Sequence, residues 1–308
     1  MKRKHLFGVT ILLAFAGFGS PALLAQSKQA THVIMVQVGD AYRSVQLHIP
    51  AGHDSATPLP LVFNLHGTGD TAERQELLTG MSVVANEERF LVAGGMAKFK
   101  FPDGRMAGNL SWNVNLVPDE VNDVDYILAA IDAVDRKVSV DRKRVYVTGF
   151  SGGGRMTSRL ACELSDRIAA VAPVSGVQFP DDCQPVRPIP IVTLHGVMDP
   201  SNNYHGAADP ERNSSWVMGV ESTVSKWAEN NGCGSQAIAE KITDEITRFS
   251  YGNCIAGADV TLYRIENGGH SWPGSPFADR FPERLGVTNI DIDASRLIWE
   301  FFEAHPLP

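Results

Sequence analysis

The feature that most constrains the fold of this chain is a serine set among glycines, at the point where a strand gives way to a helix. A β-branched run at residues 144–148 leads directly into the pattern G-x-S-x-G at residues 149–153, and a helical stretch ending near Leu164 follows. Such a tight turn needs small neighbours, because the strand and the helix approach each other closely. It also places Ser151 at a helix N-terminus, where the helix dipole favours developing negative charge. Glycine-rich corners of this kind also occur as plain turns, so the pattern alone leaves both interpretations open.

The rest of the chain alternates strand-like and helix-like segments. Two alternating segments, 33–38 and 45–49, predict an edge hairpin around Gly39-Asp40. Apolar runs predict strands at residues 61–65, 90–93, 168–174, 189–194 and 260–265, helical periodicity predicts helices at 71–88, 119–138 and 293–303, and residues 95–118 resemble a long surface loop. Because several strands are apolar on both faces, we expect a mostly parallel sheet with helices on both sides. The pattern predicts one doubly wound α/β domain over residues 26–308 and leaves its strand order open.

The first 25 residues are predicted to be a secretory signal peptide. A basic start at residues 1–4 precedes an apolar run at 6–18, and small residues follow near Ala22 and Ala25, where cleavage is expected. The run is short for a membrane span, and an uncleaved N-terminal anchor is the alternative. We therefore expect a secreted or periplasmic protein.

The net charge bears on partners. The formal charge is −8, and loss of the three basic residues at positions 2–4 makes it more negative. Such an acidic protein is poorly suited to bind nucleic acid or an anionic membrane surface.

Four cysteines agree with export. They stand at positions 162, 183, 233 and 254, so each consecutive pair is 21 residues apart. In an oxidising compartment this spacing suggests the disulfides Cys162–Cys183 and Cys233–Cys254, although four cysteines allow three pairings and the sequence does not choose among them. A zinc site is the competing interpretation, but there is no C-x-x-C spacing and no nearby pair of histidines.

Two further positions supply what a catalytic serine needs. A serine hydroxyl is a poor nucleophile unless a positioned base removes its proton. His270 lies in a glycine-rich loop after the last apolar strand, and Asp199 follows the strand at residues 189–194. The order Ser151, Asp199, His270 is that of α/β-hydrolases. All three positions follow the C-terminal ends of strands, where open α/β sheets place their sites. The sequence therefore predicts a Ser-His-Asp triad.

Other residues compete for these roles. Asp199 precedes a proline and also suits a turn, and Asp209, likewise before a proline, is a rival acid. The rival bases are His66, His195 and His205. Of these, His66 and His195 directly follow strands in His-Gly pairs, which better suits a role in shaping loops. The coincidence of nucleophile, acid and base in the correct order favours the triad.

An oxyanion hole is the fourth part expected of such a site. The loop His66-Gly67-Thr68-Gly69 follows an early strand and suits the loop that donates one backbone N–H. We assign the two donors to the amides of Thr68 and Gly152, and losing one such donor typically costs about 3 kcal/mol of transition-state stabilisation. A plain glycine-rich turn would use the same loop residues.

These motifs together resemble the polyhydroxybutyrate depolymerase-like esterases, a group that includes secreted feruloyl and acetylxylan esterases. The resemblance spans roughly residues 32–305 and is carried by L-H-G-T-G at 65–69, S-W-N at 111–113, V-N-D-V at 121–124, G-F-S-G-G-G-R-M at 149–156, H-G-V-M-D-P at 195–200 and G-G-H-S-W-P-G at 268–274. It implies the α/β-hydrolase fold, the triad Ser151, Asp199 and His270, and an oxyanion hole at Thr68 and Gly152. The stretch after Asp199, S-N-N-Y-H-G, departs from the apolar, proline-containing stretch usual in the group.

The predicted activity is hydrolysis of carboxylic esters by acyl transfer, with no metal or organic cofactor. The substrate is expected to be a small-molecule or polymeric ester, and the oligomeric state is left open. Trp112 and Trp272 are candidates for lining the acyl site, with a packing or loop-anchoring role as the alternative.

Three functions follow from this interpretation. The first is an esterase for soluble feruloyl, acetyl or other short acyl esters. The second is a depolymerase of hydroxyalkanoate or related polyester oligomers. It is less favoured, because depolymerases often carry a polymer-binding domain and this chain ends at Pro308, just after the last helix. The third is a hydrolase-fold binding protein without turnover, against which the triad argues; a peptidase on the same fold has no sequence feature in its favour.

Overall fold

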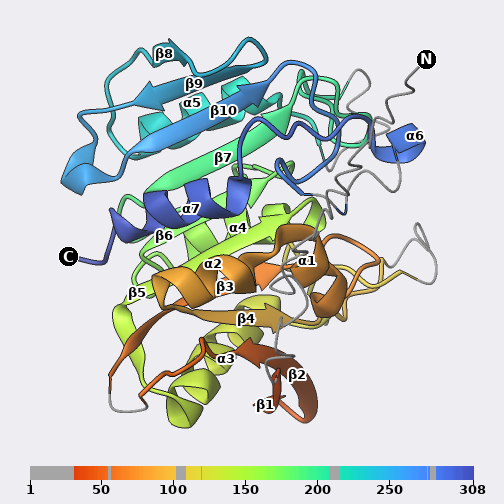
Figure 1. Ribbon diagram of the computed structural model, residues 1–308, viewed down its shortest axis with the longest axis vertical. Coiled ribbons are helices and arrows are strands. Elements are labelled where there is room, and N and C mark those ends of the chain that lie inside the picture. The colour runs from red at the N-terminus through yellow and green to blue at the C-terminus, as the bar shows by residue number, and fades with distance from the viewer. Residues whose placement is uncertain are drawn as a thin grey trace, which may run out of the picture. The chain divides into compact units, whose positions relative to one another are not determined.

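A ten-stranded sheet runs through the molecule (Figure 1). The computed structural model describes residues 31–54, 57–101, 109–118, 120–207, 216–275, 277 and 282–308, so the predicted signal peptide and the rival acid Asp209 lie outside the described residues. The strands are β1 (His32–Val38), β2 (Ala41–His48), β3 (Leu59–Leu65), β4 (Leu91–Gly95), β5 (Val140–Phe150), β6 (Ala170–Val174), β7 (Ile191–Gly196), β8 (Ile238–Lys241), β9 (Ile246–Tyr251) and β10 (Val260–Ile265).

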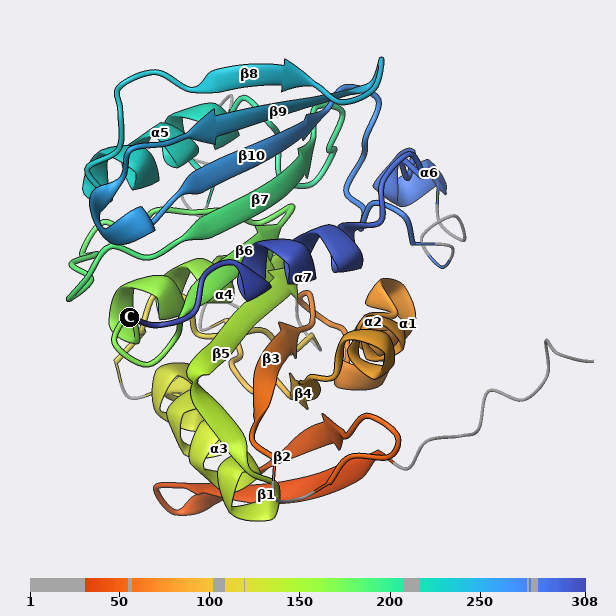
Figure 2. The same cartoon turned by 60° about the vertical axis from the view of Figure 1, so that its left-hand side comes forward.

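The strand order in the sheet is β1-β2-β4-β3-β5-β6-β7-β10-β9-β8. The run from β4 to β10 is parallel throughout, whereas β1 and β2 at one edge and β9 and β8 at the other pair antiparallel (Figure 2). This confirms the expected mostly parallel sheet, and the carboxyl ends of β3, β5, β7 and β10 come to one side of it.

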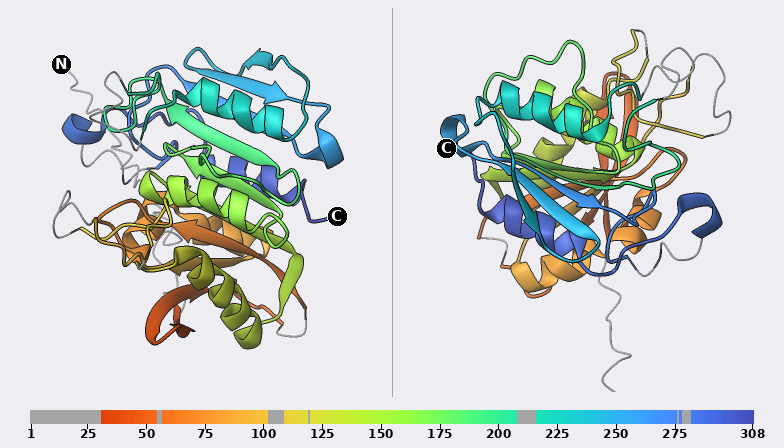
Figure 3. Two further views of the ribbon diagram at one scale, coloured as in Figure 1. Left: turned by 180° about the vertical axis from the view of Figure 1, so that it is seen from behind. Right: turned by 90° about the horizontal axis from the view of Figure 1, so that it is seen from above.

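Helices cover both faces of the sheet. They are α1 (Ala72–Thr79), α2 (Met81–Glu88), α3 (Asp123–Lys137), α4 (Gly152–Glu163), α5 (Val220–Asn230), α6 (Pro282–Leu285) and α7 (Ala294–Glu303), with a 3-10 turn, η2 (Ile255–Gly257). Side chains of α3, α4 and α5 fill one apolar core, and those of α1, α2 and α7 fill the other. Figure 3 shows the α3, α4 and α5 layer from the side opposite to Figure 1. No helix within the described residues is long and apolar enough to cross a membrane.

Two expectations need correction, and one helix and one hairpin were not predicted. The helix expected over residues 71–88 is two helices, because Gly80 is in the left-handed conformation (φ 59°) and ends α1. The helix expected from Asp119 begins at Asp123, where the Asn122 side chain accepts from the amides of the first turn. Helix α5 and the hairpin β8–β9 were not predicted, and every residue of β8 is exposed, so this strand carries no apolar pattern that sequence inspection would detect.

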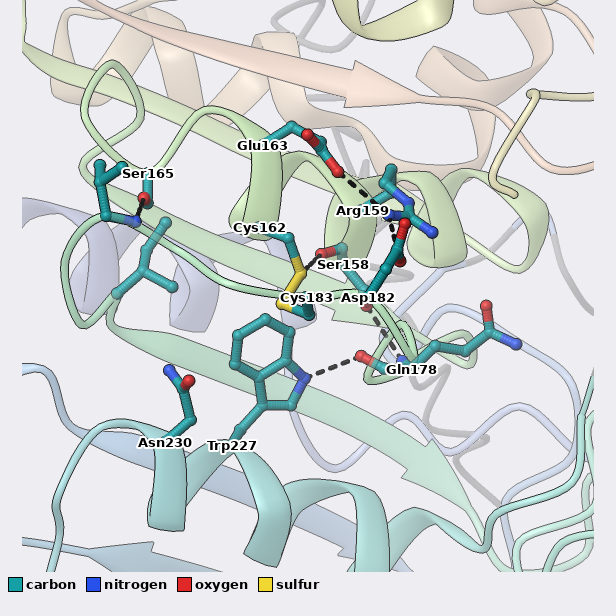
Figure 4. Close-up of a disulfide and its surroundings, with 12 residues drawn as sticks. Ser158, Arg159, Cys162, Glu163, Ser165, Gln178, Asp182, Cys183, Trp227 and Asn230 are labelled. Carbon is teal, nitrogen blue, oxygen red and sulfur yellow. Dashed lines mark hydrogen bonds and ion pairs between the residues drawn. A yellow bond between two sulfur atoms is a disulfide. The ribbon is translucent and has the colours of Figure 1, made fainter. Parts of the chain in front are cut away.

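Two disulfides, Cys162–Cys183 and Cys233–Cys254, are present, as the equal spacing suggested. The first joins α4 to the loop that follows β6 (Figure 4). Near it the Ser158 hydroxyl accepts from the amide of Gln178, and Trp227 Nε1 donates to the carbonyl of the same residue. The loop is therefore fixed both by covalent and by hydrogen bonds.

Removing either disulfide is expected to lower the free energy of unfolding by about 3 kcal/mol, because each closes a loop of similar length in the unfolded chain. Both pairs are 21 residues apart. The double variants C162A/C183A and C233A/C254A are therefore matched, and urea unfolding of both against the wild type measures the loss. Losses below about 1 kcal/mol in both variants would contradict this expectation.

Candidate active site

Ser151 stands on a strained turn between β5 and α4. Its backbone has φ 55° and ψ −115°, a conformation unfavourable for a residue with a side chain. The Ser151 amide donates to the Val174 carbonyl at 2.9 Å, and the Ser151 carbonyl accepts from the amide of Arg155 at 3.0 Å. These bonds hold the turn as the sharp elbow that the G-x-S-x-G pattern predicted.

The neighbouring glycines are required by close packing. A Cβ added at Gly153 would clash with the Leu65 carbonyl of β3, and one added at Gly149 would lie 2.6 Å from the Gly153 backbone. Any side chain at these two positions would push α4 away from the sheet. The elbow therefore depends on glycine for space rather than for backbone freedom.

Asp199 and His270 come together from the loops that follow β7 and β10. Asp199 Oδ2 lies 2.7 Å from His270 Nδ1, and both side chains are buried. The other carboxylate oxygen, Oδ1, accepts from the amides of Ser201 and Asn202, each at 2.7 Å. Since a carboxylate only accepts hydrogen bonds, His270 Nδ1 carries the proton and Nε2 presents a lone pair.

The electrostatics keep Asp199 ionised. Burial by itself would raise the pKa of Asp199, but hydrogen bonds from His195 and His270 outweigh burial and hold that pKa well below its usual range. Asp199 is therefore a carboxylate at neutral pH. This is the state needed to orient an imidazole and to stabilise its protonated form.

His270 lies close to the elbow but is not hydrogen-bonded to Ser151. The imidazole ring of His270 lies 4.8 Å from the ring of Phe150, the residue directly before Ser151. No hydrogen bond joins the Ser151 hydroxyl to His270, both being among the described residues. Hydrogen bonds between catalytic groups are often long in unliganded enzymes and shorten when substrate binds. The structure thus brings the predicted acid and base together, with the base beside the elbow.

The predicted oxyanion loop packs directly on the start of α4. A Cβ added at Gly152 would lie 3.0 Å from the amide nitrogen of Thr68, so the two backbones are in contact. The Thr68 hydroxyl shares a hydrogen bond of 2.9 Å with Ser111, and the Gly69 amide donates to the Leu110 carbonyl at 2.8 Å. Among the described residues, no acceptor takes the Thr68 N–H. Both amides assigned to the oxyanion hole therefore lie at the same end of α4.

His66 shapes this loop. Its Nε2 accepts from the amide of Ala97 at 3.1 Å, so Nδ1 carries the proton and donates to the Gly67 carbonyl at 2.7 Å. Burial lowers the pKa of His66 and keeps the ring neutral. One ring nitrogen therefore bonds within the loop and the other bonds to the segment after β4, which agrees with a loop-shaping role. His205, another rival base, has an exposed side chain.

Sequence inspection missed a buried ion pair behind the loop. Arg43 of β2 and Asp123 at the start of α3 are 2.6 Å apart and nearly inaccessible to solvent. Asp123 Oδ2 accepts from the amide of Asn113 at 2.6 Å, which holds the segment that bears Ser111. The sequence pointed to this region only through two motifs that carry the family resemblance, S-W-N at 111–113 and V-N-D-V at 121–124.

An aromatic pocket opens beside the oxyanion loop and α4. Its volume is about 530 Å³, including space open to solvent, and it is lined by Phe99, Phe101, Ser111, Trp112, Asn113, Val114, Asn115, Val117, Arg155 and Gln178. Ser111 is the residue bonded to the Thr68 hydroxyl, and Arg155 lies one helical turn after Ser151. The pocket therefore begins next to the predicted site of attack.

The two tryptophans have different surroundings. Trp112 lines this pocket and donates from Nε1 to the His66 carbonyl at 2.8 Å. It therefore both forms part of the pocket and holds the loop that bears His66. Trp272 is 1% exposed, packs within the core beneath α7 and donates to the Ser295 hydroxyl. Trp112 is just as buried, and Trp272 is not among the residues that line this pocket, so the role of Trp272 at the acyl site stays a prediction.

Known proteins resemble this chain in sequence and fold. A family model described as Phospholipase/Carboxylesterase matches residues 47–209, just over half of the chain. Feruloyl esterase B of Piromyces equi is 30% identical over 237 residues, which are 74% of this chain and 42% of that protein. Probable feruloyl esterase C of Aspergillus oryzae is 30% identical over 267 residues, 85% of this chain and 84% of that protein. Among solved structures, acetyl xylan esterase from Aspergillus awamori has a TM-score of 0.56 at 15% identity, covering 79% of this chain and 93% of that one, which shows a shared fold.

Proposed function

The chain belongs to the phospholipase/carboxylesterase family and is a carboxylic ester hydrolase, and from that premise we propose that it cleaves esters of aromatic carboxylic acids through a Ser-His-Asp triad. The observation that carries this proposal is the 2.7 Å contact between Asp199 and His270 beside the strained elbow at Ser151. The similarity to two feruloyl esterases supports an aromatic acyl group.

The proposed mechanism is acyl transfer in two steps. His270 Nε2 takes the proton of the Ser151 hydroxyl as the oxygen attacks the ester carbonyl, and Asp199 stabilises the imidazolium that forms. The amides of Thr68 and Gly152 hold the oxyanion of the tetrahedral intermediate. His270 then gives its proton to the departing alcohol. A water molecule, activated by the same imidazole, attacks the acyl-enzyme and releases the acid with Ser151 restored.

The acyl group is proposed to occupy the aromatic pocket. Phe99 and Phe101 meet edge to face with ring centroids 5.2 Å apart, and Trp112 forms another part of the wall. Aromatic walls favour a flat ring by offset-stacked or edge-to-face contacts. Short aliphatic hydroxyacids would leave much of this surface unused, which is why an aryl ester is preferred over a hydroxyalkanoate oligomer.

The purified enzyme is expected to hydrolyse methyl ferulate with a higher kcat/KM than hydroxybutyrate oligomers. Substituting Phe101→Ala is expected to lower kcat/KM for methyl ferulate about tenfold, as for other losses of apolar contact in a binding pocket. Hydrolysis of p-nitrophenyl acetate, whose acyl group is too small to fill the pocket, should change less than about twofold. Initial rates on the three substrates provide the measurement.

Phe249→Ala is the matched control, because Phe249 is also half-buried but lies on β9, far along the sheet from the pocket. Faster turnover of hydroxybutyrate oligomers than of methyl ferulate would overturn the proposed substrate class. Equal losses on methyl ferulate and p-nitrophenyl acetate in Phe101→Ala would overturn the assignment of the pocket.

We also propose that the enzyme acts outside the cytoplasm. The signal-like segment at residues 1–25 and the two disulfides support this, since disulfides persist in oxidising compartments. N-terminal sequencing of the exported protein tests the proposal, and a protein found only in the cytoplasm would contradict it.

A further inference from the structure

A second histidine contacts the carboxylate of Asp199. His195, the second-last residue of β7, has its Nε2 3.3 Å from Asp199 Oδ2 and 2.8 Å from the Asn202 carbonyl oxygen. The same Oδ2 is the atom that lies 2.7 Å from His270 Nδ1. One carboxylate oxygen therefore faces two imidazoles, one from the end of β7 and one from the loop after β10.

The surroundings of His195 fix its protonation. Both neighbours of Nε2 are acceptors, so Nε2 must carry a proton. The other ring nitrogen, Nδ1, is buried and has no hydrogen-bond partner among the described residues. A second proton there would leave a buried cationic N–H without an acceptor, which is costly. His195 is therefore a neutral N–H donor, and neither nitrogen can serve as a base for Ser151.

The ring of His195 is also held in place. It is 1% exposed and lies against the rings of Trp216 and Tyr204, with centroids 5.6 Å and 5.9 Å away. Trp216 is itself anchored by a 2.8 Å hydrogen bond to the Asn203 carbonyl. A ring enclosed in this way cannot turn its Nε2 away from Asp199 without displacing its neighbours.

The turn after β7 is braced on its other side as well. The Asn202 side chain donates to the Ser175 carbonyl at 2.6 Å, and Ser175 is in the left-handed conformation at the end of β6. The His195 N–H thus lies between a braced carbonyl and the carboxylate. The buried Nδ1 of His195, which has no hydrogen-bond partner among the described residues, is destabilising. Such unfavourable features occur at functional sites, and this one lies beside the proposed catalytic acid.

From this geometry we propose that His195 is a positioning residue, which fixes the Asp199 carboxylate and limits the negative charge that it presents to His270. The inference rests on the proposed triad. As a donor, His195 stabilises the carboxylate anion and draws charge from the oxygen that faces His270. The protonated form of His270 is then favoured less strongly than it would be beside a carboxylate with one imidazole donor.

Few side chains among the described residues face His195 and Asp199 from the elements packed against them. They are His270 after β10, with Phe150 of the elbow against its ring, and Tyr204 and Trp216 after β7. Arg264 is the cross-strand neighbour of His195 on β10, but it pairs with Glu221 and Glu266, and Glu221 accepts from the Tyr204 hydroxyl. Among the described residues, Asp199 is the charged group within ion-pair distance of His195. The effect of removing the His195 N–H on His270 is therefore carried through Asp199.

The test is a pair of substitutions at His195. His195→Phe keeps an aromatic ring between Tyr204 and Trp216 but removes the N–H, whereas His195→Gln restores an amide N–H donor. In His195→Phe we expect kcat for p-nitrophenyl acetate to fall about tenfold, the cost of a hydrogen bond to a charged group, with KM nearly unchanged. The acid limb of its kcat/KM profile should move up by about one pH unit. His195→Gln should recover most of the rate and the wild-type limb.

A merely structural role would lower Tm without moving the acid limb, and that result overturns the proposal. Should His195→Phe not fold, NMR of 15N-histidine-labelled wild-type protein decides: we expect His195 to stay neutral with its proton on Nε2 across the acid limb. A His195 that titrates along that limb overturns the proposal. Failure of the proposed triad itself has a different signature, since Ser151→Ala would then keep its activity.

Discussion

Ser151→Ala is expected to lower kcat for p-nitrophenyl acetate on the order of 10⁵-fold, because the substitution removes the atom that forms the acyl-enzyme. The remaining activity should come from the oxyanion amides of Thr68 and Gly152 and from substrate binding, which still act on direct attack by water. Steady-state rates, together with mass spectrometry of protein treated with an organophosphonate, measure the loss and locate the labelled residue.

The fold of the variant should be unaffected. Ser151 makes its described hydrogen bonds through the backbone, so loss of the hydroxyl leaves the elbow bonds to Val174 and Arg155 in place. Ser225→Ala, at an exposed serine on α5, is the matched control and should keep full activity. Hydrolysis that persists in Ser151→Ala at more than about a hundredth of the wild-type rate would show that another residue is the nucleophile.

The features that could be predicted from the sequence are those set by residues close together in the chain. The strand–glycine–serine–glycine–helix unit was predictable because its steric needs fall on consecutive residues, and Gly149 and Gly153 indeed have no room for a side chain. The approach of Asp199 and His270 was predictable because each follows an apolar strand in a recognisable loop. The disulfide spacing was similarly visible in the chain.

What the sequence did not reveal depends on contacts between distant segments. Arg43 and Asp123 are eighty positions apart and meet only once β2 and α3 are packed, so no pattern marks them as partners. The contact of His195 with Asp199 was hidden for another reason: the spacing i, i+4 suggests a helix, whereas here a turn after β7 brings the two side chains together. The surroundings of Trp272 were not predictable, because its motif lies beside His270 in sequence while its side chain packs in the core.

Asp199→Asn is expected to lower kcat about 10⁴-fold at neutral pH, although the side chain keeps its size. The carboxylate accepts from the amides of Ser201 and Asn202 through Oδ1 and faces the imidazoles of His195 and His270 through Oδ2. An amide has one acceptor oxygen, so in either orientation two of these donors face an NH₂ group. If the NH₂ group faces His270, the imidazole proton moves from Nδ1 to Nε2. The ring can then no longer take the proton of Ser151.

The pH dependence of stability separates this chemical effect from damage to the fold. Because the folded-state pKa of Asp199 is depressed, its ionisation stabilises the fold at pH values above the unfolded pKa, about 3.9, and this stabilisation is lost as the pH falls through the folded pKa. The difference in Tm between the wild type and Asp199→Asn should therefore be greatest near neutral pH and shrink below about pH 4. Asp244→Asn, at an exposed aspartate paired with Lys241, is the matched control and should change neither rate nor Tm appreciably. Near-normal activity in Asp199→Asn would mean that the imidazole of His270 is oriented by something other than this carboxylate, and the proposed triad would lose its acid.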